Sequence, residues 1–282
     1  MGIIKGALEL TSYKFKSMKI AIIGVGNLGY SIAVGILAQK KEINCKSLYL
    51  TKRNTNSLSH LEKVSMVKTT TDNRRAVKYS NVIILAVQPA QLKSVLEEIQ
   101  DVIDPKKHTI ISVATGRKIE EIEALLAKNV AVIRCMPNTA ISVGQSMTCM
   151  SANEAGKLNF HLAKSIFNSL GETMCIEESL MQAATVICAS GIAFWMRLIR
   201  ATAQGAVQLG FHSEEAQKLS MHTCLGAASL LIDSQSHPEQ EIDKVTTPSG
   251  CTIEGLNEME HQGLSSSIIK GLVTSYEKIN QI

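Results

Sequence analysis

A short apolar run that leads directly into three closely spaced glycines constrains this chain more than any other feature. Residues 19–23 read K-I-A-I-I, a β-rich run, and residues 24–29 read G-V-G-N-L-G. The segment that follows, 31–39, carries a helical pattern of apolar side chains. A strand, a glycine-rich turn and a helix in this order are typical of the first unit of an open α/β sheet. We therefore expect the fold to begin with parallel strands.

The alternation of strand and helix continues to about residue 178. Nearly continuous apolar runs are expected where a parallel sheet is covered by helices on both faces. The later predicted strands are 46–50, 81–86, 108–113 and 130–135, and the helices between them are 91–99 and 118–126.

Beyond residue 178 the strand signal almost disappears and helical patterns dominate. The predicted helices are 179–189, 193–209, 213–233, 252–262 and 264–278. We therefore predict an α/β protein with a Rossmann-type parallel-sheet domain over 18–178 and an all-helical domain over 179–282. Residues 1–17 precede a second methionine, and we interpret them as a lead-in, either disordered or upstream of the true start. The helical half is rich in Ala and Gly, so a partner chain is expected to complete it as a homodimer.

Composition excludes several classes of function. The chain has 282 residues, a net charge of +4 and no Lys/Arg run longer than two, which argues against a nucleic-acid surface. We find no apolar stretch of the roughly 18 residues that a membrane helix needs, so no membrane partner is expected. The seven cysteines are scattered and never spaced as C-x-x-C, which argues against a disulfide framework and a metal site. This cysteine usage suits a reducing compartment, and we predict a cytoplasmic protein.

The glycine-rich turn is the candidate nucleotide site. Gly24 would allow the tight turn, Gly26 would let the backbone approach a pyrophosphate, and Gly29 would let the helix pack on the strand. Asn27 and Leu28 lie between them, where the helix N-terminus faces the phosphates with its partial positive charge. The alternative is a purely structural turn.

The residues after the second predicted strand indicate which dinucleotide is bound. A site for NAD usually has Asp or Glu there, whereas this chain has Lys52 and Arg53 and no acid. Arg can pair in a bidentate manner with a 2′-phosphate, and a charge-assisted hydrogen bond contributes roughly 1.5–3 kcal/mol. A preference for NADP(H) of about 10–100-fold follows. NAD(H) remains an alternative, in which the two side chains are solvated loop charges.

A second candidate site lies in the stretch V-T-T-P-S-G-C-T-I-E-G-L at 245–256. Four hydroxyl side chains surround a Pro-Ser-Gly turn immediately before a predicted helix that begins at Thr252. One Ser or Thr usually suffices to cap a helix. The stretch therefore indicates either a capped turn between helices or a cradle for an anion.

Taken together, six stretches resemble the Δ1-pyrroline-5-carboxylate reductases. The resemblance covers most of 18–282, and the last stretch is the most specific. The stretches are I-G-V-G-N-L-G at 23–29, T-D-N at 71–73, I-L-A-V-Q-P at 84–89, M-P-N-T at 136–139, A-S-G at 189–191 and D-K-V-T-T-P-S-G-C-T at 243–252.

The resemblance implies a helical dimerisation domain, larger rings of dimers in many members, and an active site completed between subunits. It also implies a hydride transfer from NADPH to the C=N carbon of a five-membered cyclic imine that bears a carboxylate. Thr252 would contact the ring nitrogen, and the carboxylate would be held by Thr247, Ser249, Gly250 and Cys251. Beyond the glycine turn and the basic pair, the implied cofactor contacts are Asn73, Ala86, Val87, Pro89, Met136, Pro137 and Asn138.

Several positions depart from the family pattern, mostly on the substrate side. Gln88 stands where the family usually has Lys, Ala140 replaces a Pro, and Ser249 replaces a Gly. Residues 188–194 read C-A-S-G-I-A-F and lack a Gly, a Pro and a Tyr of the family segment. Two alternatives stay open: a reductase of a related cyclic imino acid, and a catalytically silent protein that binds NADP(H).

Overall fold

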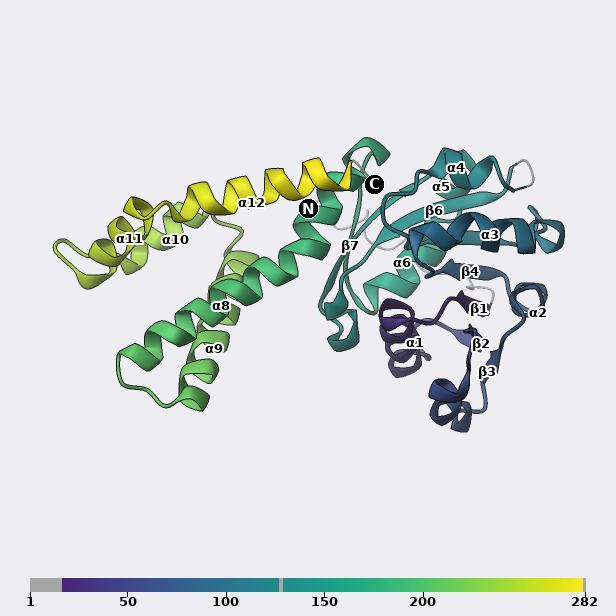
Figure 1. Ribbon diagram of the computed structural model, residues 1–282, viewed down its shortest axis with the longest axis horizontal. Coiled ribbons are helices and arrows are strands. Elements are labelled where there is room, and N and C mark those ends of the chain that lie inside the picture. Colours follow the sequence, from purple (N-terminus) through teal and green to yellow (C-terminus); the bar gives the residue numbers. More distant parts are fainter. Residues whose placement is uncertain (1–16, 127–128, 281–282) are drawn as a thin grey trace, which may run out of the picture. The chain divides into compact units, whose positions relative to one another are not determined.

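The computed structural model describes residues 17–126 and 129–280, so the predicted lead-in 1–17 lies almost wholly outside the described residues (Figure 1). Contacts divide the chain into two compact units, one that ends at Ala189 and one that begins at Ser190. The first unit is built on a sheet and the second is helical, which confirms the predicted fold class.

The first unit contains an eight-stranded sheet with the order β3-β2-β1-β4-β5-β6-β7-β8. All neighbouring strands are parallel except β6 and β7, which are antiparallel; β7 is a strand that the sequence analysis did not predict. The strands are β1 Met18–Ile23, β2 Cys45–Thr51, β3 Val67–Thr70, β4 Val82–Leu85, β5 Thr109–Ser112, β6 Ala131–Met136, β7 Ser146–Ala152 and β8 Gly171–Cys175.

The central strands form where the sequence is most apolar. Every residue of β4, which reads V-I-I-L, is buried, and β1 exposes only Lys19. Strand β1 pairs with β2 on one side and with β4 on the other, with Ile22 opposite Leu50 and Ile84. Because both faces are covered, these strands need no polar side, which explains their continuous apolar runs.

Helices cover the two faces of the sheet with separate apolar clusters (Figure 1). Residues of α1 and α6 belong to one cluster, and residues of α2, α3 and α4 belong to the other. The helices of this unit are α1 Asn27–Ala38, α2 Asn73–Lys78, α3 Pro89–Ile99, α4 Ile119–Glu123, α5 Glu154–Lys157, α6 Phe160–Asn168 and α7 Met181–Ala184. Short 3-10 turns lie at Asn56–Lys63, Gln100–Val102, Thr139–Val143 and Glu178–Leu180, and a π-helical segment lies at Thr185–Ser190.

Helix α1 begins at Asn27 rather than at residue 31, where the sequence pattern placed it. The residues N-L-G of the glycine motif form its first turn, so the motif ends inside the helix. Helix α3 likewise begins two residues earlier than predicted, with Pro89 at its first position. Proline suits that position because its fixed φ is helical and its missing N–H has no partner there.

The second unit consists of α8 Gly191–Gln208, α9 Ser213–Ser234, α10 Pro238–Val245, α11 Cys251–His261 and α12 Leu264–Ile279. Helices α8 and α9 pack against each other, as do α11 and α12. Gly210 has φ +107° and Gly263 has φ +81°, left-handed conformations that end one helix and turn the chain into the next.

The expectation that no stretch is long and apolar enough to span a membrane was wrong. The helical stretch Glu178–Gln208 is long and apolar enough to cross a membrane by length and composition alone, with a mean hydropathy of 1.5 in its best window. Residues 179–196 contain no Asp, Glu, Lys or Arg, although Gln, Ser and Thr interrupt their apolar runs. Only 28% of that window is buried inside the chain, so the stretch carries an apolar surface that is open in a single copy.

Candidate functional site

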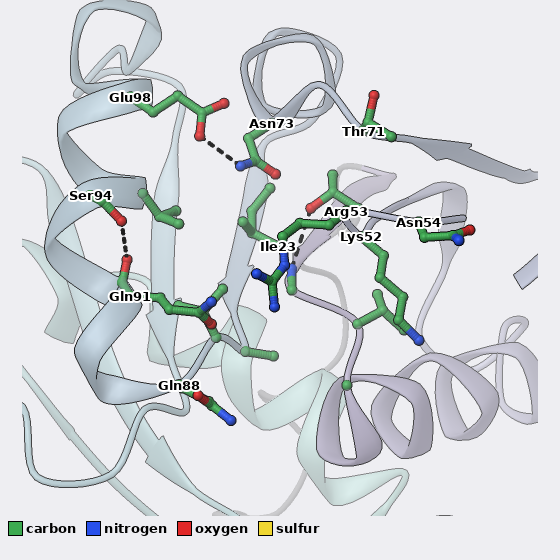
Figure 2. A pocket seen from close by; sticks show the side chains of 17 residues that line it. Ile23, Lys52, Arg53, Asn54, Thr71, Asn73, Gln88, Gln91, Ser94 and Glu98 are labelled. Atoms are coloured by element: carbon green, nitrogen blue, oxygen red, sulfur yellow. Dashed lines mark hydrogen bonds between the residues drawn. The ribbon is translucent and has the colours of Figure 1, made fainter. Parts of the chain in front are cut away.

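A cavity of about 590 Å³ opens at the carboxyl ends of β1, β2 and β4 in the first unit. Figure 2 shows Lys52, Arg53 and Asn54 on one side of it and Gln91, Ser94 and Glu98 on the other. Of the predicted cofactor residues, those that line it are Gly24, Gly26, Lys52, Arg53, Asn73, Ala86 and Val87. Ligands bind at this edge in open α/β sheets, where the strand order reverses on either side of the first strand.

The three glycines of the motif meet different steric demands. Gly24 has φ +86°, and a Cβ there would overlap the side chain of Val87. A Cβ on Gly29 would lie 2.9 Å from the carbonyl oxygen of Gly24 and 3.2 Å from Ala86 Cβ, so a side chain would push α1 away from the sheet. Around Gly26, by contrast, no heavy atom lies within 4 Å of an added Cβ. The turn is therefore tight at both ends and open in the middle, on the cavity side.

Thr51, the last residue of β2, holds the glycine turn in place. Its carbonyl oxygen accepts hydrogen bonds from the backbone N–H groups of Gly24 at 3.2 Å and Val25 at 2.9 Å. The Gly26 N–H donates to the Gly24 carbonyl at 2.8 Å, which closes the turn on itself. The first N–H groups of α1 have no intrahelical acceptors, as at any helix start, and are available to an anion.

The side of the cavity next to β2 is basic. Lys52 and Arg53 both line it, and the Lys52 Nζ donates to Ser57 Oγ at 3.0 Å. This bond holds the ammonium against the 3-10 turn that follows β2. No acidic residue stands beside the pair in the lining of this side. The arrangement suits a phosphate better than an unmodified ribose.

The opposite side of the cavity, formed by α3, was missed by the sequence analysis. Gln91, Ser94, Val95 and Glu98 line it at intervals of three and four residues, which places them on one face of the helix. Glu98 Oε2 accepts a hydrogen bond from Asn73 Nδ2 at 2.8 Å, which links α3 to α2 across the rim. The spacing of these side chains after V-Q-P could have revealed this face.

Other predicted cofactor residues do not line the cavity in the described structure. Asn27, Leu28 and Gly29 form the first turn of α1 behind Gly26, and Pro89 begins α3. Met136 is the last residue of β6, two strands further along the sheet from β4, and Pro137 and Asn138 follow it.

Asn138 is buried and its side chain is already engaged. Its Oδ1 accepts from the Ala140 N–H at 3.0 Å, and its Nδ2 donates to the carbonyl oxygen of Cys188 at 3.0 Å. Its own N–H donates to Ser146 Oγ at 3.1 Å. The first of these bonds needs the Ala140 N–H, which the proline of the resembling family could not supply. Asn138 therefore holds the loop after β6 in shape.

The candidate substrate residues lie in the second unit, on the turn between α10 and α11. The Gly250 N–H donates to the Thr247 carbonyl at 2.9 Å, and Ser249 has φ +56°. Proline at the second position and a positive φ at the third are the pattern of a type II turn. A Cβ on Gly250 would overlap the Thr247 side chain, so this glycine is required by close packing.

Helix α11 begins at Cys251, one residue before the predicted start at Thr252. Gly250 adopts an extended conformation as the N-cap, which makes Cys251 the first helical residue. Both Cys251 and Thr252 are exposed within the described chain, so Cys251 is no packing residue of this unit. Across the described residues we find no group of three metal-ligating side chains.

Comparison with known proteins extends these observations. Residues 178–282 match the family described as pyrroline-5-carboxylate reductase dimerisation, and residues 19–116 match the family of NADP oxidoreductases, coenzyme F420-dependent. Pyrroline-5-carboxylate reductase 1 of Dictyostelium discoideum is 45% identical over 92% of this chain, which spans about half (49%) of that relative's length.

Solved structures cover the chain over both units. A pyrroline-5-carboxylate reductase from Coxiella burnetii is 31% identical, with a TM-score of 0.86 over 94% of this chain and 98% of that one. The Plasmodium falciparum pyrroline carboxylate reductase with NADP bound has a TM-score of 0.82 at 23% identity, over 94% of this chain and 97% of that one.

Proposed function

This chain belongs to the pyrroline-5-carboxylate reductase family, and we propose that it reduces Δ1-pyrroline-5-carboxylate to L-proline in proline biosynthesis. The observation that carries the proposal is the basic cavity beside the open glycine turn, in a chain that also matches the dimerisation family over 178–282. We propose NADPH as the preferred reductant.

The residues of the cavity fit an NADP(H) molecule. The open space at Gly26 admits a pyrophosphate, and the N-terminus of α1 offers N–H groups to it. Lys52 and Arg53 provide two positive charges for a 2′-phosphate, which a ribose hydroxyl could not use. When bound, the cofactor supplies the hydride that reduces the C=N bond.

The turn Thr247–Gly250 and the start of α11 would hold the substrate carboxylate. A helix N-terminus favours an anion through its unpaired N–H groups and its dipole. The Thr247 hydroxyl can add a hydrogen bond. Thr252, in the first turn of the same helix, would place its hydroxyl at the ring nitrogen and orient the imine or relay its proton.

We further propose a cytoplasmic homodimer, or a larger assembly of dimers, formed through the second unit. Large apolar side chains are exposed on its helices, more than a monomer usually leaves uncovered. The exposed residues include Trp195, Met196 and Val207 on α8, Leu219, Met221, Leu225, Leu230 and Ile232 on α9, and Ile269 and Val273 on α12. A second copy of the chain would cover them.

The reaction is tested by following NADPH absorbance with Δ1-pyrroline-5-carboxylate and, separately, with the six-membered cyclic imino acid. We expect faster oxidation with the five-membered ring. Oxidation with the larger ring alone would support the related imino-acid reductase, to which Ser249 and Ala140 point. The absence of oxidation with both substrates would contradict the proposal.

The role of Thr252 is tested by replacement. Thr252→Ala is expected to lower kcat/KM at least about tenfold, because a lost hydrogen bond to a reacting group removes about 1.5–3 kcal/mol. Thr252→Ser keeps the hydroxyl and should retain most of the activity. Equal rates for Thr252→Ala and the wild type, with both folded, would reject this assignment.

A further inference from the structure

Two cysteines that the reductase chemistry does not use lie side by side in the first unit. Cys149 is in β7 and Cys188 is in the π-helical segment Thr185–Ser190, and their Sγ atoms are 3.9 Å apart. They are 39 positions apart in the sequence, so the fold alone brings them together. The pair lies in an apolar cluster with Met136, Met181 and Ala184.

The two thiols differ in exposure and in acidity. Cys149 is buried, whereas Cys188 is partly exposed and can meet a small solute. The hydrogen bond from the Cys149 thiol stabilises the Cys188 thiolate and lowers the pKa of Cys188 to about 7. The pKa of Cys149 is raised, because its thiol is engaged in the hydrogen bond to Cys188 and because it is buried. One thiolate next to one thiol is the arrangement from which a disulfide forms.

The pair also contacts the end of β6 and the start of the loop that follows it. In the β6–β7 ladder, Cys149 lies opposite Met136. The carbonyl oxygen of Cys188 accepts the hydrogen bond from Asn138 Nδ2 at 3.0 Å. When the two sulfurs move, the residues bonded or paired to them can move as well. These include Met136 and Asn138, which with Pro137 form the M-P-N of the family motif.

We propose that Cys149 and Cys188 form a reversible disulfide when the protein meets a hydroperoxide, and that this bond lowers reductase activity by displacing the loop of Asn138. The effect on activity rests on the proposed function, whereas the formation of the bond does not. A disulfide needs the sulfurs about 2.05 Å apart, so Cys149 and Cys188 must close the 3.9 Å between their Sγ atoms, which pulls on the π-helical segment and β7. Misplacing a positioning group by about 1 Å can cost on the order of 100-fold in rate.

The chemistry balances with the hydroperoxide as the oxidant. The Cys188 thiolate attacks the peroxide, the O–O bond breaks, and a sulfenic acid and an alcohol or water result. The Cys149 sulfur then attacks the sulfenic sulfur, the S–O bond breaks, and water leaves as the S–S bond forms. Overall, the two thiols lose two protons and two electrons, and the peroxide takes up both as it is reduced to an alcohol or water and a second water. A dithiol such as dithiothreitol reverses the reaction by exchange.

The bond is tested on the full-length, fully reduced protein with hydrogen peroxide. After the remaining thiols are alkylated, peptide mapping should recover a Cys149–Cys188 cross-link that disappears with dithiothreitol. The variants Cys149→Ala and Cys188→Ser should lose it, and Cys224→Ser, on α9 in the other unit, should keep it. Recovery of both cysteines as alkylated thiols after peroxide treatment would overturn the proposal, whatever the enzyme reduces.

The consequence is tested with the same samples. Treatment of the wild type and of Cys224→Ser should lower kcat/KM at least about tenfold, with recovery in dithiothreitol, and Cys149→Ala should resist. Binding of NADPH, measured by fluorescence, gives a second readout that does not depend on the imine. If the wild type and Cys149→Ala lose activity equally, oxidation elsewhere, for example at the exposed Cys251, is responsible and the proposed control is wrong.

Discussion

Among single residues, Ser249 carries the least favourable backbone of the candidate substrate turn. Its φ of +56° lies in the left-handed region, where a side chain costs roughly 1–2 kcal/mol relative to the right-handed region. The resembling family has glycine there, which has no such cost. The serine hydroxyl beside the proposed carboxylate site offers a physical reason to retain a strained residue.

Replacing Ser249 by glycine should therefore stabilise the protein. We expect Ser249→Gly to raise the free energy of unfolding by up to about 1 kcal/mol, because relief of strain exceeds the entropy that glycine adds to the unfolded chain. Ser249→Ala keeps the Cβ and serves as the control, with little change. Urea denaturation measures both, and equal stability of the two variants would contradict this reading of the turn.

A second prediction for a single residue concerns Arg53, which should set the preference for NADPH over NADH. Arg53→Ala should reduce the preference for NADPH over NADH in kcat/KM by about 10–100-fold, since one charge-assisted bond contributes roughly 1.5–3 kcal/mol. Arg117→Ala removes an arginine that pairs with Glu121 and does not line the cavity, so its ratio should be unchanged. The same ratio in both variants would assign Arg53 to the solvated surface.

At the scale of elements, the apolar pattern predicted five central strands but missed β7 and the two edge strands, β3 and β8. Strands β1, β2, β4, β5 and β6 were expected because each contains a short run of apolar residues. Strand β3 reads V-K-T-T and β8 reads G-E-T-M-C, with exposed positions that resemble a loop. Pairing with a neighbouring strand makes these segments strands, and a pattern of side chains carries little trace of pairing.

The residues of the candidate site also fall into those that the sequence predicted and those that it did not. The turns that bear glycine or proline were located because backbone geometry demands those residues. The lining face of α3 was missed because ordinary polar residues such as Gln91 and Ser94 become site residues only through their position. The meeting of Cys149 and Cys188 was equally hidden, because it depends on how β7 and the segment after α7 pack.

His108 lies just before β5, and it makes the stability of the folded protein depend on pH. Its side chain is buried, and its Nδ1 accepts a hydrogen bond from the Asp104 N–H at 2.9 Å. Burial, with a smaller contribution from Lys107, lowers the pKa of His108. The unfolded chain takes up a proton near pH 6.5, whereas the folded protein resists it, so stability is full above pH 6.5 and falls below it.

We accordingly expect the Tm to fall as the pH is lowered from 7.5 to 5.5, and His108→Asn to weaken this dependence. The asparagine Oδ1 can accept the same N–H and does not titrate. Thermal unfolding followed by circular dichroism at several pH values measures the slope. If Tm falls equally steeply with pH in the variant and in the wild type, other groups cause the loss of stability at low pH.

At the scale of the whole molecule, the second unit buries too little of its apolar surface to be complete alone. Helix α8 buries only Gly191 and Ala203, and α9 buries only Ala216 and Ser220, although both contain many large apolar residues. The match of residues 178–282 to a dimerisation family supports the proposal that a second copy of the chain covers this surface.

A charge on this surface should prevent assembly. Leu225 on α9 is 62% exposed, and Leu225→Glu is expected to shift the protein from dimer to monomer and to lower its Tm. Leu158→Glu, at an 80% exposed leucine of the first unit, is the matched control and should leave the dimer intact. Sedimentation velocity at micromolar concentration separates the two, and a dimeric Leu225→Glu protein would exclude this face from the interface.

The candidate cofactor cavity is lined by residues between Ile23 and Glu98, all of which belong to the first half of the polypeptide. In the proposed function, capture of the reductant and recognition of the ring would be encoded mainly in separate stretches of the gene. Substitutions in the turn between α10 and α11 could therefore change which imine is bound without changing the preference for NADPH over NADH. Substitutions such as Ser249 and Phe194 mark the half in which such divergence would accumulate first.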